Sequence, residues 1–267
     1  MPLFSESRKR LDRAVVHAES VKKIWESLID PKSYNTVIEM NGDWTEGIVK
    51  YVRSSPLPEN ELAIEFGEMF YQLRAALDHL VYKASVLAEG VDPPSNENRV
   101  EFPICIDAAK FTRSTVNDPP FPNQLRDWIE EIQPYNAAKH TGTDLEYVVH
   151  ALRILHDCAR KDRHRRLHVV GAVATQFRWD FLLWPGRLLS VQPLSMNLLE
   201  GNNEFLRIKV DGFIPGGNGK IQLNSELISE ISIDEIPITK PGESGAALNA
   251  VFVAVQQVIE YFEGWHK

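Results

Sequence analysis

The chain has 267 residues, of which 43% are hydrophobic and 25% charged, and its formal net charge is −8. These ordinary globular values exclude disorder along the whole chain, because enough apolar surface is present to offset the ordering entropy. The acidic balance also argues against a protein that coats nucleic acid with its whole surface, which needs a broad positive field. We expect a single α+β domain over residues 1–267.

The cysteine content and the N-terminal segment indicate a reducing compartment. Cys105 and Cys158 are the only cysteines, too few for a disulfide framework or a cysteine-based zinc site. The first residues carry charges where a signal peptide needs an apolar core. No stretch approaches the roughly 18 apolar residues of a membrane span. The sequence therefore predicts a cytoplasmic protein that does not contact membranes.

Apolar residues at helical spacing predict a bundle of helices. The helical core is expected at about 55–165 and is joined by helices near both ends of the chain. The expected helices span residues 4–29, 59–88, 122–132, 144–162 and 243–263. The helix at 59–88 has the most regular apolar stripe, whereas residues 91–122 are irregular and rich in Pro, Asn and Asp. A bundle with several long helices is the expected framework.

Two regions change to the period of two that is typical of strands. Residues 35–40 and 47–53 flank Asn41-Gly42, which predicts a hairpin. The β portion at about 167–236 is expected to hold strands at 167–179, 187–192, 205–212 and 227–233. Asn218-Gly219 predicts a hairpin turn between the last two. The fold class is therefore α+β, with an antiparallel sheet formed mainly by the C-terminal half.

The helix at 59–88 carries the segment Arg74-Ala-Ala-Leu-Asp-His79. At about 100° per residue, Arg74 and His79 lie on the two borders of the face opposite the apolar stripe. The residues between them on this face are Tyr71, Ala75, Asp78 and Tyr82. We expect both basic side chains outside the core, on a face that can also pair with another helix. The simpler interpretation is a surface ion pair between Arg74 and Asp78, with a solvated His79.

An arginine followed five residues later by a histidine, late in a long helix, resembles the Rx4-6H motif of HEPN domains (higher eukaryotes and prokaryotes nucleotide-binding). The resemblance implies a helical bundle that often dimerises and acts as a metal-independent endoribonuclease in toxin–antitoxin or antiviral systems. Arg74 then matches the motif arginine and His79 the motif histidine. In such dimers the two pairs form one composite site. Ala75 departs from the family, in which a polar residue often follows the arginine.

The chemistry implied by this resemblance uses the 2′-hydroxyl of the RNA as nucleophile. His79 would move the proton as general base or acid, since an imidazole titrates near neutrality. Arg74 would hold the phosphate and offset charge in the transition state. Asp78 would orient a His or Arg of the partner subunit. The products would carry a 2′,3′-cyclic phosphate and a 5′-hydroxyl, and no cofactor or metal is required.

A wider pattern of four short motifs is also familiar. Its members are Leu73-Arg-Ala-Ala-Leu-Asp-His-Leu-Val-Tyr82, Glu101-Phe-Pro-Ile104, Ile132-Gln-Pro-Tyr135 and Asp162-Arg-His-Arg165. This order is similar to a group of bacterial proteins that tend to read Asp-Lys-His-Arg in the last motif and have no assigned activity. The resemblance covers residues 60–170 and implies no reaction by itself.

Residues 160–168 hold five Lys or Arg residues and one Asp in an otherwise acidic chain. One interpretation is a phosphate-binding patch beside the site. Its members would be Arg160, Lys161, Arg163, His164, Arg165 and Arg166. Capping of the preceding helix needs only one or two cations. The other interpretation is an internal ion network of Asp162, His164 and Arg165 that fixes the junction between helix and strand.

Three functions remain open at this point. The leading hypothesis is a HEPN-like endoribonuclease of toxin or phage-defence systems, with RNA as substrate, a homodimeric assembly and an antitoxin or activator as a further partner. The alternative is a non-catalytic dimeric interaction protein or nucleotide-binding protein. A weaker idea is a metal-dependent hydrolase, whose ligands would come from His79, His150, His156, Asp157 and His164.

Overall fold

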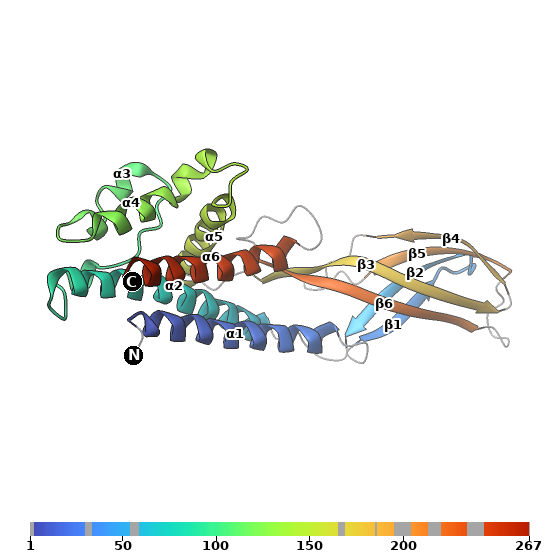
Figure 1. Cartoon of the computed structure of the whole chain (residues 1–267). Coiled ribbons are helices and arrows are strands. Elements are labelled where there is room, and N and C mark those ends of the chain that lie inside the picture. The colour runs from blue at the N-terminus through green and yellow to red at the C-terminus, as the bar shows by residue number, and fades with distance from the viewer. Residues whose placement is uncertain are drawn as a thin grey trace.

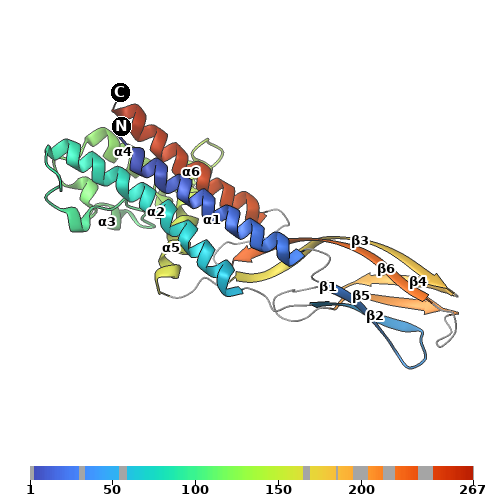
Figure 2. The same ribbon diagram turned by 90° about the horizontal axis from the view of Figure 1, so that it is seen from below.

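Four long helices lie together at one end of the molecule, and the strands extend from the other end (Figure 1). The computed structural model describes residues 3–29, 34–53, 59–164, 169–184, 186–194, 204–212, 220–233 and 243–266. The long helices are α1 (Ser5–Ile29), α2 (Glu59–Glu89), α5 (Glu146–His164) and α6 (Glu243–Trp265). The view from below shows the N- and C-termini close together at the end of the bundle farthest from the strands (Figure 2).

All five helices predicted from apolar spacing are present, the fifth being α4 (Asn123–Glu131). Their apolar stripes meet in one core to which α2 contributes the largest share. The buried members of α2 are Leu62, Phe66, Met69, Phe70, Leu73, Ala76, Leu77, Leu80, Val81 and Ala84. Each large side chain of this kind stabilises the fold by about 1.5–3 kcal/mol on burial. The core therefore fixes the position and rotation of α2, which carries the candidate site.

Residues 90–145 form short helical turns around an extended segment. They include α3 (Ala108–Phe111) and three 3-10 helices, η2 (Glu97–Arg99), η3 (Thr115–Asn117) and η4 (Pro134–Lys139). Phe102 and Ile104, from the predicted apolar anchor, are buried in the core. This anchor brings residues 101–105 alongside α2, where they take part in the candidate site described below.

The predicted N-terminal hairpin is confirmed. Strands β1 (Tyr34–Met40) and β2 (Glu46–Arg53) pair antiparallel, from Tyr34 opposite Arg53 to Met40 opposite Gly47. The Asn41 side-chain Oδ1 accepts hydrogen bonds from the backbone N–H groups of Thr45 and Glu46 at 2.9 and 3.0 Å. The asparagine therefore closes the turn as its position in the sequence predicts.

The predicted pairing of the C-terminal strands is wrong. Strand β5 (Glu204–Asp211) lies between β2 and β4 (Arg187–Pro193) in an antiparallel sheet of order β1-β2-β5-β4. Strand β6 (Lys220–Ile233) instead pairs along its length with β3 (Val169–Trp184) in a two-stranded sheet. A turn dipeptide acts only on its neighbours, whereas strand partners are chosen by long-range register. Asn218-Gly219 itself lies outside the described residues.

The fold is thus α+β, and the N-terminal hairpin supplies half of the four-stranded sheet. Among the described helices, one is long and apolar enough to cross a membrane by length and composition, from Gly245 to Trp265 in α6. Helices that pack into protein cores pass the same test. The buried residues of α6 are Val251, Ala254, Val255, Val258, Ile259 and Phe262, all within the core of the bundle.

Candidate functional site

Helix α2 packs against α1, to which it is antiparallel, and against α5. The α1 contacts run from Arg10, whose Nη1 donates to Gln72 Oε1 at 2.9 Å, to His17, whose Nδ1 lies 2.8 Å from Glu65 Oε2. Between the three helices lies a cleft of about 200 Å³, here called the Arg74 cleft. Its lining residues are Arg10, Tyr71, Arg74, Ala75, Asp78, His79, Ala159 and Asp162. All three predicted catalytic residues, Arg74, Asp78 and His79, therefore line one cleft.

Arg74 differs from the expectation of a basic group outside the core, because its side chain is only 13% exposed. Its Nη2 donates a hydrogen bond to the carbonyl oxygen of Phe102 and lies 3.2 Å from Asp78 Oδ1. Its Nη1 is buried and has no hydrogen-bond partner among the described residues. The predicted Arg74–Asp78 ion pair is present, but it is not a surface pair. A helical wheel projects the residues of one helix only, so it cannot show that the segment around Phe102 covers Arg74.

The Arg74–Asp78 pair holds one peptide segment from both sides. While Arg74 donates to the Phe102 carbonyl, Asp78 Oδ1 accepts a hydrogen bond from the Phe102 N–H at 2.9 Å. Gln133, which is 0% exposed, continues this arrangement: its Nε2 donates to Pro103 O at 2.9 Å and its Oε1 accepts from Cys105 N at 2.8 Å. Three of the four sequence motifs therefore meet at residues 102–105.

His79 borders a second, larger cleft of about 480 Å³, here called the Lys83 cleft. Its lining residues are Leu3, Phe4, Ser5, Glu6, Ser7, His79, Tyr82, Lys83 and Asp92. The pKa of the Glu6 carboxyl is lowered, mainly by its hydrogen bond with Lys9 and to a lesser extent by the nearby His79. His79 therefore stands at the boundary between two clefts and faces a carboxylate of α1.

Asp162 and Arg10 also line the Arg74 cleft, although the sequence motifs did not predict this position for either residue. The Asp162 side chain lies directly over Gly67 of α2, where an added Cβ would be 2.7 Å from the Asp162 carboxyl carbon. Burial raises the pKa of the Asp162 carboxyl, and the charge of Glu68 raises it further. A glycine inside so regular a helix is a sequence signal for such a close approach. For Arg10, no feature of the sequence indicates that its side chain lines the cleft.

We expect Gly67→Ala to lower the free energy of unfolding by about 1–3 kcal/mol, because overpacking outweighs the gain in helix propensity. In an Asp162→Ala background the same change should be stabilising by up to about 1 kcal/mol, since the clash is gone. Chemical denaturation of the four proteins of this double-mutant cycle measures the coupling. Equal effects of Gly67→Ala in both backgrounds would contradict the contact.

His156 lies on α5 close to Arg74. Burial lowers the pKa of His156 below its ordinary value, and the positive charge of Arg74 lowers it further. The unfolded chain therefore binds a proton more readily at this position, so stability falls as the pH drops below about 6.5, the ordinary histidine value.

We expect the melting temperature to decrease between pH 7 and pH 5.5, and the decrease to be smaller in His156→Gln. His150, which is exposed on the same helix, provides the matched control His150→Gln. A decrease of the same size in wild type and His156→Gln would show that another group carries the pH dependence.

Of residues 160–162, the part of the basic cluster whose side chains the structure describes, the acidic Asp162 is the one that lines the Arg74 cleft. Ala159 and Asp162 line the cleft, whereas the exposed Arg160 and the half-buried Lys161 do not. Only the backbone of Arg163 and His164 is described, at the end of α5, and Arg165 and Arg166 lie outside the described residues. The predicted phosphate-binding role of all six residues stays a prediction.

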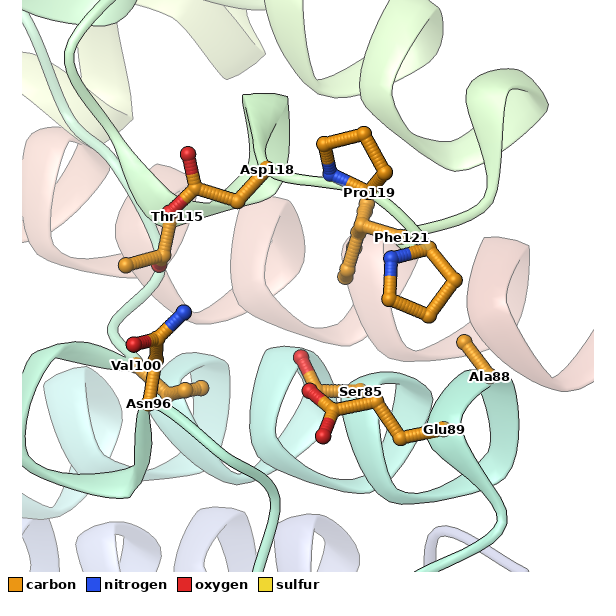
Figure 3. A pocket seen from close by; sticks show the side chains of 10 residues that line it. Ser85, Ala88, Glu89, Asn96, Val100, Thr115, Asp118, Pro119 and Phe121 are labelled. Carbon is orange, nitrogen blue, oxygen red and sulfur yellow. The ribbon is translucent and has the colours of Figure 1, made fainter.

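Two other possible sites are poor candidates. The pocket between the end of α2 and residues 115–121 holds only about 20 Å³, which is room for a single water molecule (Figure 3). The Glu89 carboxylate beside it accepts hydrogen bonds from the Ser95 backbone and hydroxyl at 2.7 and 2.6 Å. Among the described residues no three His, Cys, Asp or Glu side chains are grouped so that they could hold a metal ion. The His164 side chain, one of the predicted ligands, lies outside that search.

Comparison of the chain with sequence families, with curated proteins and with solved structures finds no match. The HEPN resemblance therefore rests on the residue pattern and on the position of that pattern in a long helix. Any functional conclusion has to be argued from the clefts and the side chains that line them.

Proposed function

We propose that the chain is a metal-independent endoribonuclease of HEPN type. The observation that carries the proposal is the convergence of Arg74, Asp78 and His79 on one cleft, with Arg10 from another helix beside them. Two guanidinium groups suit a phosphodiester, and a histidine at the same cleft suits proton transfer. His79 takes the proton of the 2′-hydroxyl, the 2′-oxygen attacks phosphorus, and the bond to the 5′-oxygen breaks. The leaving 5′-oxygen takes a proton from water or from the His79 imidazolium, and the imidazole returns to its neutral form.

Arg74 can bind a substrate phosphate and keep its contacts with Phe102 and Asp78. The Glu101 carboxylate lies 3.7 Å from Arg74 Nη2 and is 69% exposed. This distance is too long for a hydrogen bond, and an ion pair with so exposed a carboxylate contributes little to stability. A phosphate, which takes charge-assisted hydrogen bonds from a guanidinium, can replace that carboxylate at low cost. Asp78 Oδ1, which lies 3.2 Å from the same nitrogen, keeps the guanidinium in position.

The proposal includes a homodimer in which two Arg74/His79 pairs form a composite site, as the HEPN resemblance implies. It includes action in the cytoplasm, where RNA is available, and an antitoxin or activator that controls the enzyme. Tyr71, which is 53% exposed on the α2 face between the two basic residues, offers a partner helix an apolar contact. Sedimentation of wild type against Tyr71→Arg tests whether this face is the dimer contact.

The proposed reaction is tested by incubating the purified protein with total RNA in excess EDTA and, in parallel, with Mg²⁺. We expect equal cleavage in both, because the chemistry uses no metal. Cleavage that needs added metal would favour a metal-dependent hydrolase. An enzyme that needs an activator is tested by expressing the protein in bacterial cells and infecting them with phage. Toxicity to the host cells should then appear on infection.

A non-catalytic binding protein is the second candidate, and one observation favours it. Arg74 and Asp78 already bind both polar groups of Phe102, so a structural role accounts for two of the three predicted catalytic residues. In that case Arg74→Ala lowers stability while His79→Ala changes nothing measurable in an RNA assay. The comparison of these two variants separates the candidates.

A further inference from the structure

The Lys83 cleft has no role in the chemistry described so far, although it is the larger of the two clefts that His79 borders. Its volume of about 480 Å³ lies in the range of about 300–1,000 Å³ that is typical of small-molecule sites. The Arg74 cleft, at about 200 Å³, is smaller than that range. His79 lines both, so the two clefts adjoin at this side chain, and together they are here called the groove.

We propose that the Lys83 cleft binds a nucleotide of a single RNA strand whose adjoining phosphate lies in the Arg74 cleft. The strand then crosses His79, and the cut falls inside the bound segment rather than at its end. The inference rests on the proposed function and adds to it the form of the substrate, a single strand of several nucleotides.

The side chains of the Lys83 cleft match the parts of a nucleotide. Tyr82 Oη donates a hydrogen bond to Asp92 Oδ1 at 2.9 Å, which fixes the ring as a platform for a base. Stacking on an aromatic ring is tolerant of sequence, because every base has a π face. Lys83 supplies a point charge for a backbone phosphate. Together they offer the stacking surface and the cation that single-strand binding sites combine.

The carboxylates in this cleft argue against a simple anion as its ligand. Glu6, which is paired with Lys9, and Asp92 line the cleft together with a single lysine, and their carboxylates disfavour inorganic phosphate there. A nucleotide carries hydrogen-bond donors as well, namely the ribose hydroxyls and the amino groups of the bases, and carboxylates accept from these groups. The mixture of charges therefore favours a nucleotide over a bare phosphate.

The length of the groove fits more than one nucleotide. The α2 residues that line the two clefts run from Tyr71 to Lys83. These two positions are about 18 Å apart along α2 at 1.5 Å per residue. A stacked strand rises about 3.4 Å per nucleotide along its axis, so more than one nucleotide fits along the groove.

The test measures binding of fluorescein-labelled, fully 2′-O-methylated oligonucleotides in EDTA by fluorescence anisotropy. The methyl group blocks the 2′-oxygen, so binding is observed without cleavage. We expect the wild-type protein to bind a tetranucleotide about tenfold more tightly than a dinucleotide, because the longer strand also occupies the Lys83 cleft. Lys83→Met should remove about tenfold of the tetranucleotide affinity and leave dinucleotide affinity within about twofold. Tyr82→Leu should act in the same way. Lys110→Met, an exposed lysine on α3, is the control for net charge.

The inference would be overturned if the tetranucleotide did not bind, or if the dinucleotide and the tetranucleotide bound with equal affinity. It would also be overturned if Lys83→Met and Lys110→Met lost the same tetranucleotide affinity. Competition by inorganic phosphate as strong as by unlabelled tetranucleotide would overturn it as well. If a second copy of the chain covered the groove, the tetranucleotide would not bind, and this result too would overturn the inference. If the expected binding is found but no RNA is cut, the proposed function fails and the nucleotide site stands. If RNA is cut but length has no effect, the site fails and the proposed function stands.

Discussion

His79→Ala is expected to lower the rate of RNA cleavage by at least about 100-fold, and by as much as about 10,000-fold. General acid–base catalysis by a positioned histidine contributes rate factors of this size. His79 borders both clefts, so its removal deletes the proton-transfer group at the centre of the groove. The measurement is the initial rate of cleavage of a labelled single-stranded RNA in EDTA.

His150→Ala is the matched control, since His150 is exposed on α5 and lines neither cleft. It should keep the wild-type rate within about twofold, an energy change of less than about 0.5 kcal/mol. Because His79 is half-buried at the surface of α2, His79→Ala should also keep the wild-type melting temperature within a few degrees. An unchanged rate in His79→Ala, with an intact fold, would remove the histidine from the mechanism.

Gln133→Ala is expected to lower the free energy of unfolding by about 3 kcal/mol or more. The Gln133 side chain satisfies the carbonyls of Pro103 and Ile129 and the N–H of Cys105, all by hydrogen bonds of 2.8–2.9 Å. Leaving a buried polar group without its partner costs about 1–3 kcal/mol, and three such groups are affected. The truncation also leaves a cavity, which adds to the loss. Chemical denaturation gives the difference in free energy.

The change at Gln133 should also reach the site. Residues 102–105 lose one of their two supports, so the Phe102 peptide no longer holds Arg74 and Asp78 in a fixed arrangement. Gln124→Ala, an exposed glutamine on α4, is the control and should change stability by less than about 0.5 kcal/mol. If Gln133→Ala were as stable as this control, the hydrogen bonds of Gln133 would not hold the segment.

The helices and the hairpin could be predicted from sequence because their signals are local. Apolar spacing located α2, and the helical wheel put Arg74 and His79 on opposite borders of the face that lines the Arg74 cleft. The burial of Arg74 could not be predicted, since its cover comes from Phe102, 28 residues later. For the same reason Asn218-Gly219 did not identify β3 as the partner of β6, because β3 begins at Val169, 51 residues before the start of β6 at Lys220.

The remaining parts of the site depend on how helices pack. Gly67 could have been read as a close helix approach, but the sequence does not say that Asp162 of α5 fills the space. Arg10 reaches the cleft only because α1 lies antiparallel to α2, with Arg10 opposite Gln72. The two clefts meet at His79 for the same reason, because the first turn of α1 forms the wall of the second cleft.

The most direct test of the central claim is the chemical nature of the ends made when a defined single-stranded RNA is cut in EDTA. The account predicts 2′,3′-cyclic phosphate and 5′-hydroxyl ends in wild type and no product when a single 2′-deoxynucleotide replaces the nucleotide 5′ to the cut. In His79→Ala the same ends should form at least about 100-fold more slowly. Products with 3′-hydroxyl ends, or cutting by His79→Ala at the wild-type rate, would contradict a ribonuclease site at Arg74 and His79.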